Sequence, residues 1–335
     1  MRAWVVRAPG PIESAPLTLV ERPRPEPGPG ELLVRIRACG VCRTDLHLAE
    51  GDLPPRHPAT VPGHEVVGEV VGHGPGAGAR IPLGHTVGIA WLRGTCGVCR
   101  HCARGAENLC PRSTFTGWDA DGGYAEYATV PEAYAYPLPD DEDPVASTPL
   151  LCAGIIGYRA LRRTGIQPGD RLGIWGFGAS AHLTAQIAVR QGAEVHVFTR
   201  STASQQLASR LGATSSQGVY DDSPVPLDAA IIFAPVGSLV PVALSALDRS
   251  GVLAIAGIHL TDVPPLNYER HLFYEREVRS VTANTRLDGT QFLALATAIR
   301  PELTVVRYPF DAADQALADL AADRVTGVAV LDIAP

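Results

Sequence analysis

The sequence RLGIWGFGASA occupies residues 171–181 and largely decides the fold. Residues 171–175 form a short apolar run typical of a buried strand, and a glycine-rich turn follows it directly. The turn, Gly176-Phe177-Gly178-Ala179-Ser180-Ala181, fits the pattern G-x-G-x-x-G/A and opens a predicted helix over 179–191. Glycines here let the backbone approach a pyrophosphate, which the amides and the dipole at a helix N-terminus attract. The sequence therefore predicts a dinucleotide-binding βαβ unit at this point.

Strands and helices alternate after this turn. Strands are predicted over 194–198, 228–234 and 252–256, with helices over 203–211 and 239–247 between them. Such alternation indicates βαβ units and a parallel sheet. After about residue 282 the chain returns to short mixed elements, which we expect to pack on the first domain.

The first 150 residues have a different pattern. They are rich in Gly and Pro, and short β-type runs such as 31–38 and 65–71 are separated by turns. This pattern predicts a small antiparallel β-domain. A length of 335 residues fits two domains. We therefore expect an α/β protein with a doubly wound parallel sheet and a second, β-rich domain.

Composition and charge narrow the function classes. A hydrophobic fraction of 46% and a charged fraction of 19% are ordinary for a globular protein. A net charge of −7 argues against nucleic acid or an anionic membrane surface as the main partner. The sequence shows neither the apolar run of about 18 residues that a membrane helix needs nor the start of a signal peptide. We expect a cytoplasmic protein with reduced cysteines, whose clusters favour metal binding over disulfides.

One cluster holds four of the seven cysteines within fifteen residues, spaced C-x2-C-x2-C-x7-C. Four thiolates this close can surround one tetrahedral zinc ion, and such a closed site is structural because no position remains for substrate. An iron–sulfur cluster is the alternative, since it also takes four cysteines. The cysteines are Cys96, Cys99, Cys102 and Cys110.

A second metal site is predicted from Cys42, His64 and Cys152. Two cysteines and one histidine leave the fourth zinc position open, which is the ligand set of an alcohol-oxidising zinc site. Spacing alone carries little weight here, because a lone Cys or His is most often a core residue. The polar residues crowded around Cys42 and His64 favour the metal, since polar groups without partners are costly in a plain core.

The neighbours of these residues fit the same chemistry. Zinc favours the deprotonated form of an alcohol, and the released proton must reach water. The Thr44 hydroxyl can pass this proton on, and His47 can deliver it to solvent. Asp45 can orient a ligand, and Glu65 can enter the metal shell during ligand exchange. Cys39 is expected to be a buried packing residue.

The cofactor type follows from the end of the second strand, which reads Thr199-Arg200-Ser201. NAD-binding proteins commonly carry an acidic residue here to bind the ribose hydroxyls, and this chain has none. Thr, Arg and Ser can instead donate hydrogen bonds to a 2′-phosphate. The sequence thus predicts a preference for NADP(H), with NAD(H) possible. In the alternative interpretation, Arg200 is only a solvated residue at a helix start.

These features together resemble the zinc-containing alcohol dehydrogenases of the medium-chain dehydrogenase/reductase superfamily. The resemblance covers nearly the whole chain and implies a GroES-like catalytic domain (1–152) with both zinc sites, a Rossmann domain (153–282) and a C-terminal segment (283–335) that returns to the first. It also implies hydride transfer between NADP(H) or NAD(H) and an alcohol or aldehyde, in a homo-dimer or homo-tetramer. The segments that carry it are GVCRTDLHLAEGDLP, PGHEVVGEV, WLRGTCGVCRHCARGAENLC, DGGYAEYA, PLLCAG and GFGASA.

The resemblance also assigns roles to single residues. Cys42, His64 and Cys152 match the catalytic zinc ligands with Glu65 beside them, and the cluster at 96–110 matches the structural zinc lobe. Thr44 and His47 match the proton relay, and Arg43 matches a residue that contacts the cofactor pyrophosphate. Two further activities stay open, namely a specialised reductase of a biosynthetic pathway and a cofactor-binding protein without catalysis.

The predicted substrate pocket rests on Trp91 and Leu53. Both resemble pocket positions of dehydrogenases that act on small alcohols. Trp91 narrows the pocket, whereas Leu53 leaves more room than the Trp that often stands there in ethanol-specific enzymes. We therefore expect medium-sized primary alcohols and the matching aldehydes. The alternative is that both residues belong to the ordinary core.

Overall fold

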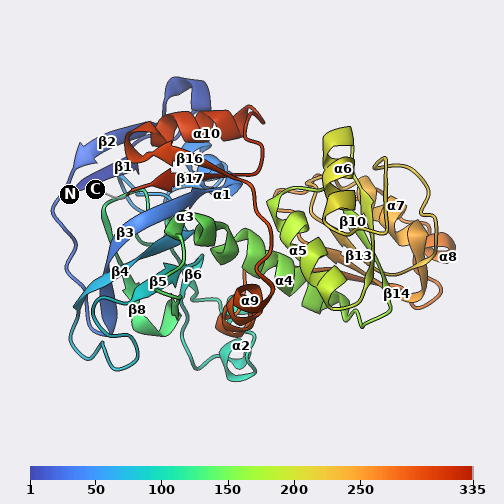
Figure 1. Cartoon of the computed structure of the whole chain (residues 1–335), viewed down its shortest axis with the longest axis horizontal. Helices are drawn as coiled ribbons and strands as arrows, with labels where there is room; N and C mark the ends of the chain where they lie inside the picture. The colour runs from blue at the N-terminus through green and yellow to red at the C-terminus, as the bar shows by residue number, and fades with distance from the viewer. Residues whose placement is uncertain (334–335) are drawn as a thin grey trace. The chain divides into compact units, whose positions relative to one another are not determined.

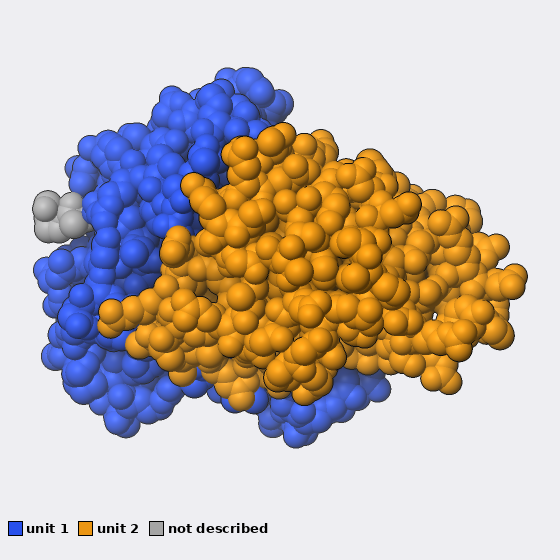
Figure 2. Space-filling view, turned by 45° about the vertical axis from the view of Figure 1, so that its right-hand side comes forward, with its two compact units in different colours: residues 1–152, 283–290, 303–335 blue, residues 153–282, 291–302 orange. Residues whose placement is uncertain are grey.

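The computed structural model describes residues 1–333, which form two compact units. Residues 291–302 belong to unit 2, which differs from the expectation that all of 283–335 returns to the first domain. The physical reason is Phe292, whose fully buried ring packs so closely on Gly154 that a Cβ there would overlap it. Unit 1 comprises Met1–Cys152, Ala283–Thr290 and Leu303–Pro335, and unit 2 comprises Ala153–Thr282 and Gln291–Glu302 (Figure 2).

Unit 1 is built on a sheet of seven strands. They are β3 (Glu31–Val41), β4 (Val66–His73), β5 (Thr86–Ile89), β8 (Tyr127–Pro131), β9 (Ala135–Pro137), β16 (Val305–Pro309) and β17 (Val328–Asp332). Their order is β16-β17-β3-β4-β5-β9, and β8 also pairs with β3. All neighbours are antiparallel except β16 and β17. The predicted antiparallel β-domain is confirmed, and its core is lined by apolar residues from these strands.

Shorter elements complete unit 1. The strands β1 (Arg2–Val6) and β2 (Leu17–Glu21) pair with each other, as do β6 (Leu92–Gly94) and β7 (Thr114–Phe115). The α-helices are α1 (Arg43–Glu50), α2 (Arg100–Ala103), α3 (Pro144–Ser147) and α10 (Ala313–Ala321). The 3-10 helices are η1 (Ile12–Ser14), η2 (Glu107–Leu109), η3 (Glu132–Tyr134), η4 (Thr148–Leu151) and η5 (Phe310–Ala312).

Unit 2 contains a parallel sheet of six strands. They are β10 (Arg171–Trp175), β11 (Glu194–Phe198), β12 (Ser215–Gln217), β13 (Leu227–Ile232), β14 (Leu247–Ile255) and β15 (Glu277–Ser280). Their order is β12-β11-β10-β13-β14-β15, so the direction of winding reverses between β10 and β13. This is the doubly wound arrangement in which dinucleotides bind beyond the carboxyl ends of the strands at the reversal. The predicted Rossmann fold is confirmed.

The helices of unit 2 explain why its strands are apolar. α7 covers one face of β10, β13 and β14, while α5 covers the other face of β10 and α4 that of β13 and β14, so the apolar residues of these strands are buried on both faces (Figure 1). Among the described residues, no helix combines the length and apolarity needed to cross a membrane. The helices are α4 (Ala153–Thr164), α5 (Ala179–Arg190), α6 (Thr202–Arg210), α7 (Leu239–Ala246) and α8 (Tyr268–His271), and α9 (Arg286–Ile299) runs from unit 1 into unit 2.

Candidate metal and cofactor sites

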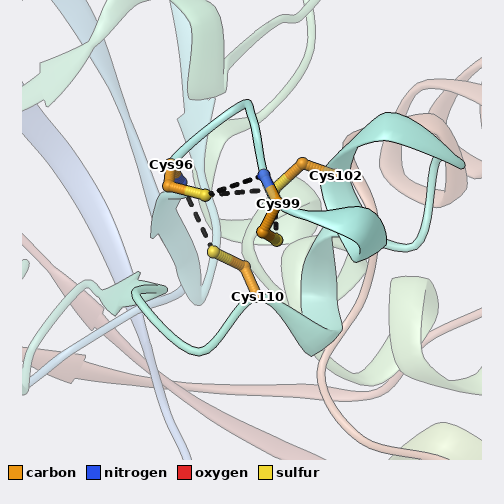
Figure 3. Close-up of side chains that lie close together, drawn as sticks. All are labelled: Cys96, Cys99, Cys102 and Cys110. Atoms are coloured by element: carbon orange, nitrogen blue, oxygen red, sulfur yellow. Dashed lines mark hydrogen bonds between the residues drawn. The ribbon is translucent and has the colours of Figure 1, made fainter.

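The four clustered cysteines converge on one point of unit 1 (Figure 3). They lie on the segment that follows β6 and includes α2 and η2, and Gly97 and Gly105 turn the chain there with φ of 72° and 73°. The Cys102 sulfur lies 3.9 Å from that of Cys96 and 3.5 Å from that of Cys99. Four ligands at about 2.3 Å from one zinc ion in a tetrahedron stand about 3.8 Å apart. The donor set thus fits one zinc ion, whereas an iron–sulfur cluster places further atoms between the thiolates.

Local hydrogen bonding prepares part of this cluster for a metal. The backbone N–H of Val98 and the side chain of Arg112 lower the pKa of Cys96 to about 5. Partial desolvation raises the pKa of Cys102 to about 11. Thiolates are the ligands, so Cys96 is ready to bind at neutral pH, whereas Cys102 releases a proton when a metal binds.

The second cluster joins residues that are far apart in the sequence. One ligand atom each from Cys42, His64, Glu65 and Cys152 lies within 4.8 Å of all the others. Cys42 caps the start of α1, His64 and Glu65 immediately precede β4, and Cys152 follows η4. The two sulfurs are 4.0 Å apart. The structure thus brings together all three predicted ligands and the predicted neighbour Glu65.

Asp45 contacts the backbone and one ligand side chain of this second cluster. The residue is 2% exposed, and its Oδ2 accepts a hydrogen bond from the Cys42 backbone N–H at 2.9 Å. Its Oδ1 accepts from the Gly63 N–H at 2.9 Å and lies 3.3 Å from Nδ1 of His64. A carboxylate on one ring nitrogen of a histidine orients the other toward a metal. Nδ1 of His64 has no hydrogen bond among the described residues, so Asp45 is its ion-pair neighbour, close enough for the predicted orienting role.

Burial and close neighbours shift the pKa values of residues in this cluster. Burial raises the pKa of Glu65 well above its usual range, and Oε2 of Glu65 has no hydrogen-bond partner among the described residues. The Cys152 thiol and then His64 lower the pKa of Cys42 well below its usual range. A buried acid with an unpartnered oxygen is costly, and a cation between the sulfurs and the imidazole removes that cost. The residues present therefore fit a zinc ion, and the two sulfurs and one nitrogen leave a position open.

The predicted relay residues lie on α1, three positions apart and hence on one face of the helix. The Thr44 hydroxyl lies 3.9 Å from the Cys42 sulfur. Nδ1 of His47 lies 2.9 Å from a carboxylate oxygen of Asp52, a residue to which sequence reasoning gave no role. The guanidinium of Arg43, on the same helix, forms an ion pair with Asp323.

An aromatic cluster adjoins His64. The Trp91 ring packs edge-on to the His64 ring at 5.1 Å and is stacked with Phe115 at 4.9 Å and with Trp118 at 6.0 Å. Nε1 of Trp118 donates to the carbonyl of Pro54 at 2.8 Å, next to Leu53, which is half-buried. Trp91 and Leu53 thus lie near one aromatic wall. Phe115 and Trp118 were missed because no spacing in the sequence connects them to His64.

In unit 2 the glycine-rich turn has the geometry of a phosphate cradle. Gly176 follows β10 with φ of 84°, and a Cβ there would lie 2.9 Å from the Ala234 nitrogen. Gly178 begins α5, and no atom lies within 4 Å of the position of its missing Cβ. Ala181 is fully buried, which satisfies the small residue required at that place. The turn thus leaves open space beside the backbone amides of Ala179 and Ser180 at a helix N-terminus.

Thr199, Arg200 and Ser201 follow the end of β11. Thr199 is 7% exposed, whereas Arg200 is exposed. The Ser201 side chain caps α6 by accepting from the Ser204 N–H, which leaves its hydroxyl hydrogen to donate to an anionic ligand. Arg200 is the charged residue of the three, and its side chain is exposed. The ring of Phe177, also predicted near the cofactor, packs on His182 at 4.5 Å.

Comparison with known proteins supplies the family. The model of the alcohol dehydrogenase GroES-like domain matches residues 28–140. The probable alcohol dehydrogenase AdhA of Mycobacterium tuberculosis is 59% identical over 335 residues, which cover 99% of this chain and 97% of that protein. The chain belongs to the zinc-dependent alcohol dehydrogenases of the medium-chain dehydrogenase/reductase superfamily. The predicted resemblance is thus confirmed.

Solved structures of this alcohol dehydrogenase family are similar to this chain over nearly its whole length. A cobalt- and zinc-bound thermostable alcohol dehydrogenase from Pyrobaculum aerophilum has 28% identity and a TM-score of 0.89, covering 99% of each chain. A putative zinc-binding dehydrogenase from Sinorhizobium meliloti bound to NADP has 28% identity and a TM-score of 0.88, covering 99% of this chain and 98% of that one. An acetophenone reductase from Geotrichum candidum bound to NAD has 26% identity and a TM-score of 0.87, covering 99% and 96%.

Proposed function

We propose that this protein transfers a hydride between a nicotinamide dinucleotide and a small to medium-sized alcohol or aldehyde, with zinc at Cys42, His64 and Cys152. The observation that carries the proposal is the convergence of these residues with Glu65 within 4.8 Å. Only the open side of such a three-ligand site can admit a substrate oxygen. The zinc-bound relatives and the family membership support this assignment.

The chemistry divides between the bound groups and the chain. Zinc supplies Lewis-acid polarisation of the substrate oxygen, and the nicotinamide accepts or supplies the hydride. Asp45 holds Cys42 and His64 in their orientations. The Thr44 hydroxyl passes on the proton that leaves the alcohol, and His47 delivers it to solvent. Glu65 is a buried acid beside the ligands, placed to exchange with one of them.

The cysteine cluster at 96–110 is proposed to hold a second, structural zinc ion. Its four thiols occupy every position of a tetrahedral site, so it has no place for substrate. The lobe is tied to the remainder of unit 1 by Glu107, which is 6% exposed and accepts a hydrogen bond from the Arg286 backbone at 3.0 Å. Its contribution is thus to the stability of unit 1.

NADP(H) is proposed as the preferred cofactor, bound at the turn from Gly176 to Ala181. The support is the exposed Arg200 in place of an acidic residue, with Thr199 and Ser201 on either side. Arg43 is proposed to contact the pyrophosphate. The test compares kcat/KM for NADP(H) and NAD(H) in the wild type and in Arg200→Ala. We expect the substitution to raise the KM for NADP(H) only, and a wild type that prefers NAD(H) would refute the proposal.

The substrates are proposed to be medium-sized primary alcohols and the matching aldehydes, admitted beside Trp91 and Leu53. The support is the contact of Trp91 with His64 and the modest size of Leu53. The decisive experiment assays a panel of alcohols and aldehydes with both cofactors. Turnover of only one complex substrate would favour the specialised biosynthetic reductase. Zinc-loaded protein that binds cofactor but turns over nothing would favour the silent cofactor-binding protein.

A homo-oligomer, dimer or tetramer, is proposed with β15 in the contact. β15 is the last strand of its sheet, Val278 on it is 43% exposed, and the rings of Phe273 and Tyr274, which precede the strand in the chain, are exposed as well. Antiparallel pairing of two copies about Val278 places Glu277 of one opposite Arg279 of the other, which is charge-complementary. Val278→Asp is expected to give a monomer in light scattering. An unchanged oligomer, or a monomeric wild type, would contradict this.

A cytoplasmic location is proposed from the chemistry of the metal sites. Both clusters need reduced thiols as ligands, and a reducing compartment keeps them so. Cell fractionation tests this, and recovery of the protein only from an oxidising compartment would contradict it.

A further inference from the structure

Helix α1 ends in a turn that brings the chain back to His47. Gly51 ends the helix with φ of 97°, a conformation that costs glycine little because it has no Cβ. The backbone N–H groups of Gly51 and Leu53 both donate to the His47 carbonyl, each at 3.0 Å. Asp52 stands between these two donors. Its position relative to His47 is therefore fixed by the backbone as well as by its side chain.

The side chains of the pair also meet. Oδ2 of Asp52 lies 2.9 Å from Nδ1 of His47, and the carboxylate is 57% exposed against 20% for the imidazole. An ionised carboxylate can only accept hydrogen bonds, so the ring hydrogen must sit on Nδ1. Nε2 is then the ring nitrogen with a lone pair. A histidine held in this way accepts a proton at one defined atom.

We propose that Asp52 is a positioning residue for proton release, which fixes the tautomer and the orientation of His47. The inference rests on the proposed function, in which His47 delivers the substrate proton to solvent. Nε2 takes up the proton, and the ring then carries its positive charge next to the Asp52 carboxylate. Loss of a proton to water then restores the neutral ring, so that charge balances over the cycle. Asp52 acts throughout by way of His47.

The test combines a spectroscopic and a kinetic measurement on zinc-loaded protein. Protein with ¹⁵N-labelled histidine is examined by NMR, with the His47 signals assigned from a His47→Gln variant. In the wild type we expect Nδ1 to appear protonated and Nε2 unprotonated, and Asp52→Asn should abolish that preference. The kcat of alcohol oxidation should fall about tenfold, in the lower range for residues that orient a reacting group. The KM for alcohol should stay unchanged, and Asp52→Glu should restore part of kcat.

Asp140→Asn is the matched control. The Asp140 carboxylate is 58% exposed and lies 3.6 Å from Nδ1 of His85, so the variant makes the same change of charge beside another histidine. It should alter neither the His47 spectrum nor kcat. Asp52→Asn with wild-type His47 shifts, or Asp140→Asn with an equal loss of kcat, would overturn the inference. A tautomer that responds in a protein without alcohol turnover would support the positioning and refute the proposed function.

Discussion

Gly40→Ala is predicted to displace Glu65 from the catalytic cluster. Gly40 lies in β3, and its N–H donates to the Glu65 carbonyl at 2.9 Å. A Cβ built on Gly40 would lie 2.8 Å from the carboxyl carbon of Glu65 and 2.9 Å from its Cβ. Ordinary carbon contacts are about 3.5–4.0 Å, so the overlap is close to 1 Å. The absence of a side chain at Gly40 thus makes the room that Glu65 occupies.

The expected loss of stability and metal affinity in Gly40→Ala follows from which atoms overlap. Rotation about the side-chain bonds of Glu65 nearer the backbone relieves the first contact only, and the second requires the backbone of Glu65 to move. Forcing an extra methyl group into a packed site costs about 1–3 kcal/mol of stability. His64 precedes Glu65 directly, so the shift also moves a proposed metal ligand. Misplacement of such groups lowers metal affinity about 10- to 100-fold.

The assay counts zinc per chain by atomic absorption after dialysis against a graded chelator, alongside chemical denaturation. At a chelator concentration that leaves the wild type with both ions, Gly40→Ala should keep only the ion of the cysteine lobe. Gly178→Ala is the control, because no atom lies within 4 Å of the added Cβ. It should keep both ions and the wild-type stability. The reasoning is wrong if Gly40→Ala retains both ions and unfolds at the wild-type denaturant concentration.

Three further predictions follow from single contacts. Leu53→Trp should lower kcat/KM for long alcohols relative to short ones, and an unchanged ratio in steady-state assays would remove Leu53 from the proposed pocket. Asp323→Asn frees Arg43 from an exposed ion pair worth about 0.2–1 kcal/mol, so cofactor should bind up to about fivefold more tightly by fluorescence titration; weaker binding would argue against the role of Arg43. In Cys42→Ala, zinc affinity of the cysteine lobe should rise with pH, because the pKa of Cys102 is raised to about 11 and its proton must leave. Chelator competition at pH 7 and 8 measures this, and equal affinities would contradict the proton release.

The fold could be predicted because its signals are local. The eleven residues 171–181 specify a strand, a backbone cradle and the start of a helix, and the structure has all three. Element ends were less predictable. The strand expected over 252–256 begins already at Leu247, because Leu247 pairs with Leu227 before an irregularity in the register. An excursion that includes Ser250 at φ of 60° separates that pair from the regular strand, and no periodicity reveals it.

The candidate site likewise has a part that local sequence predicted and a part that only tertiary contacts reveal. Cys96 to Cys110 lie within one loop, so their spacing alone predicted a shared metal. Cys42 and Cys152 are 110 positions apart, so before the structure only the ligand chemistry, the polar neighbours and the resemblance to a family connected them. Asp52, Trp118 and Asp323 had no signal in the sequence, because an exposed acid and an aromatic ring acquire their roles through tertiary contacts with His47, Trp91 and Arg43.

The most direct test of the central claim measures zinc content and alcohol-dependent reduction of NADP⁺ together in the wild type and in Cys42→Ala. The wild type should hold two zinc ions per chain and oxidise primary alcohols. Cys42→Ala should hold one ion, remain folded through its intact cysteine lobe and lose turnover. A Cys42→Ala variant that keeps wild-type turnover, or a two-zinc wild type that acts on no alcohol or aldehyde with either cofactor, would contradict the account.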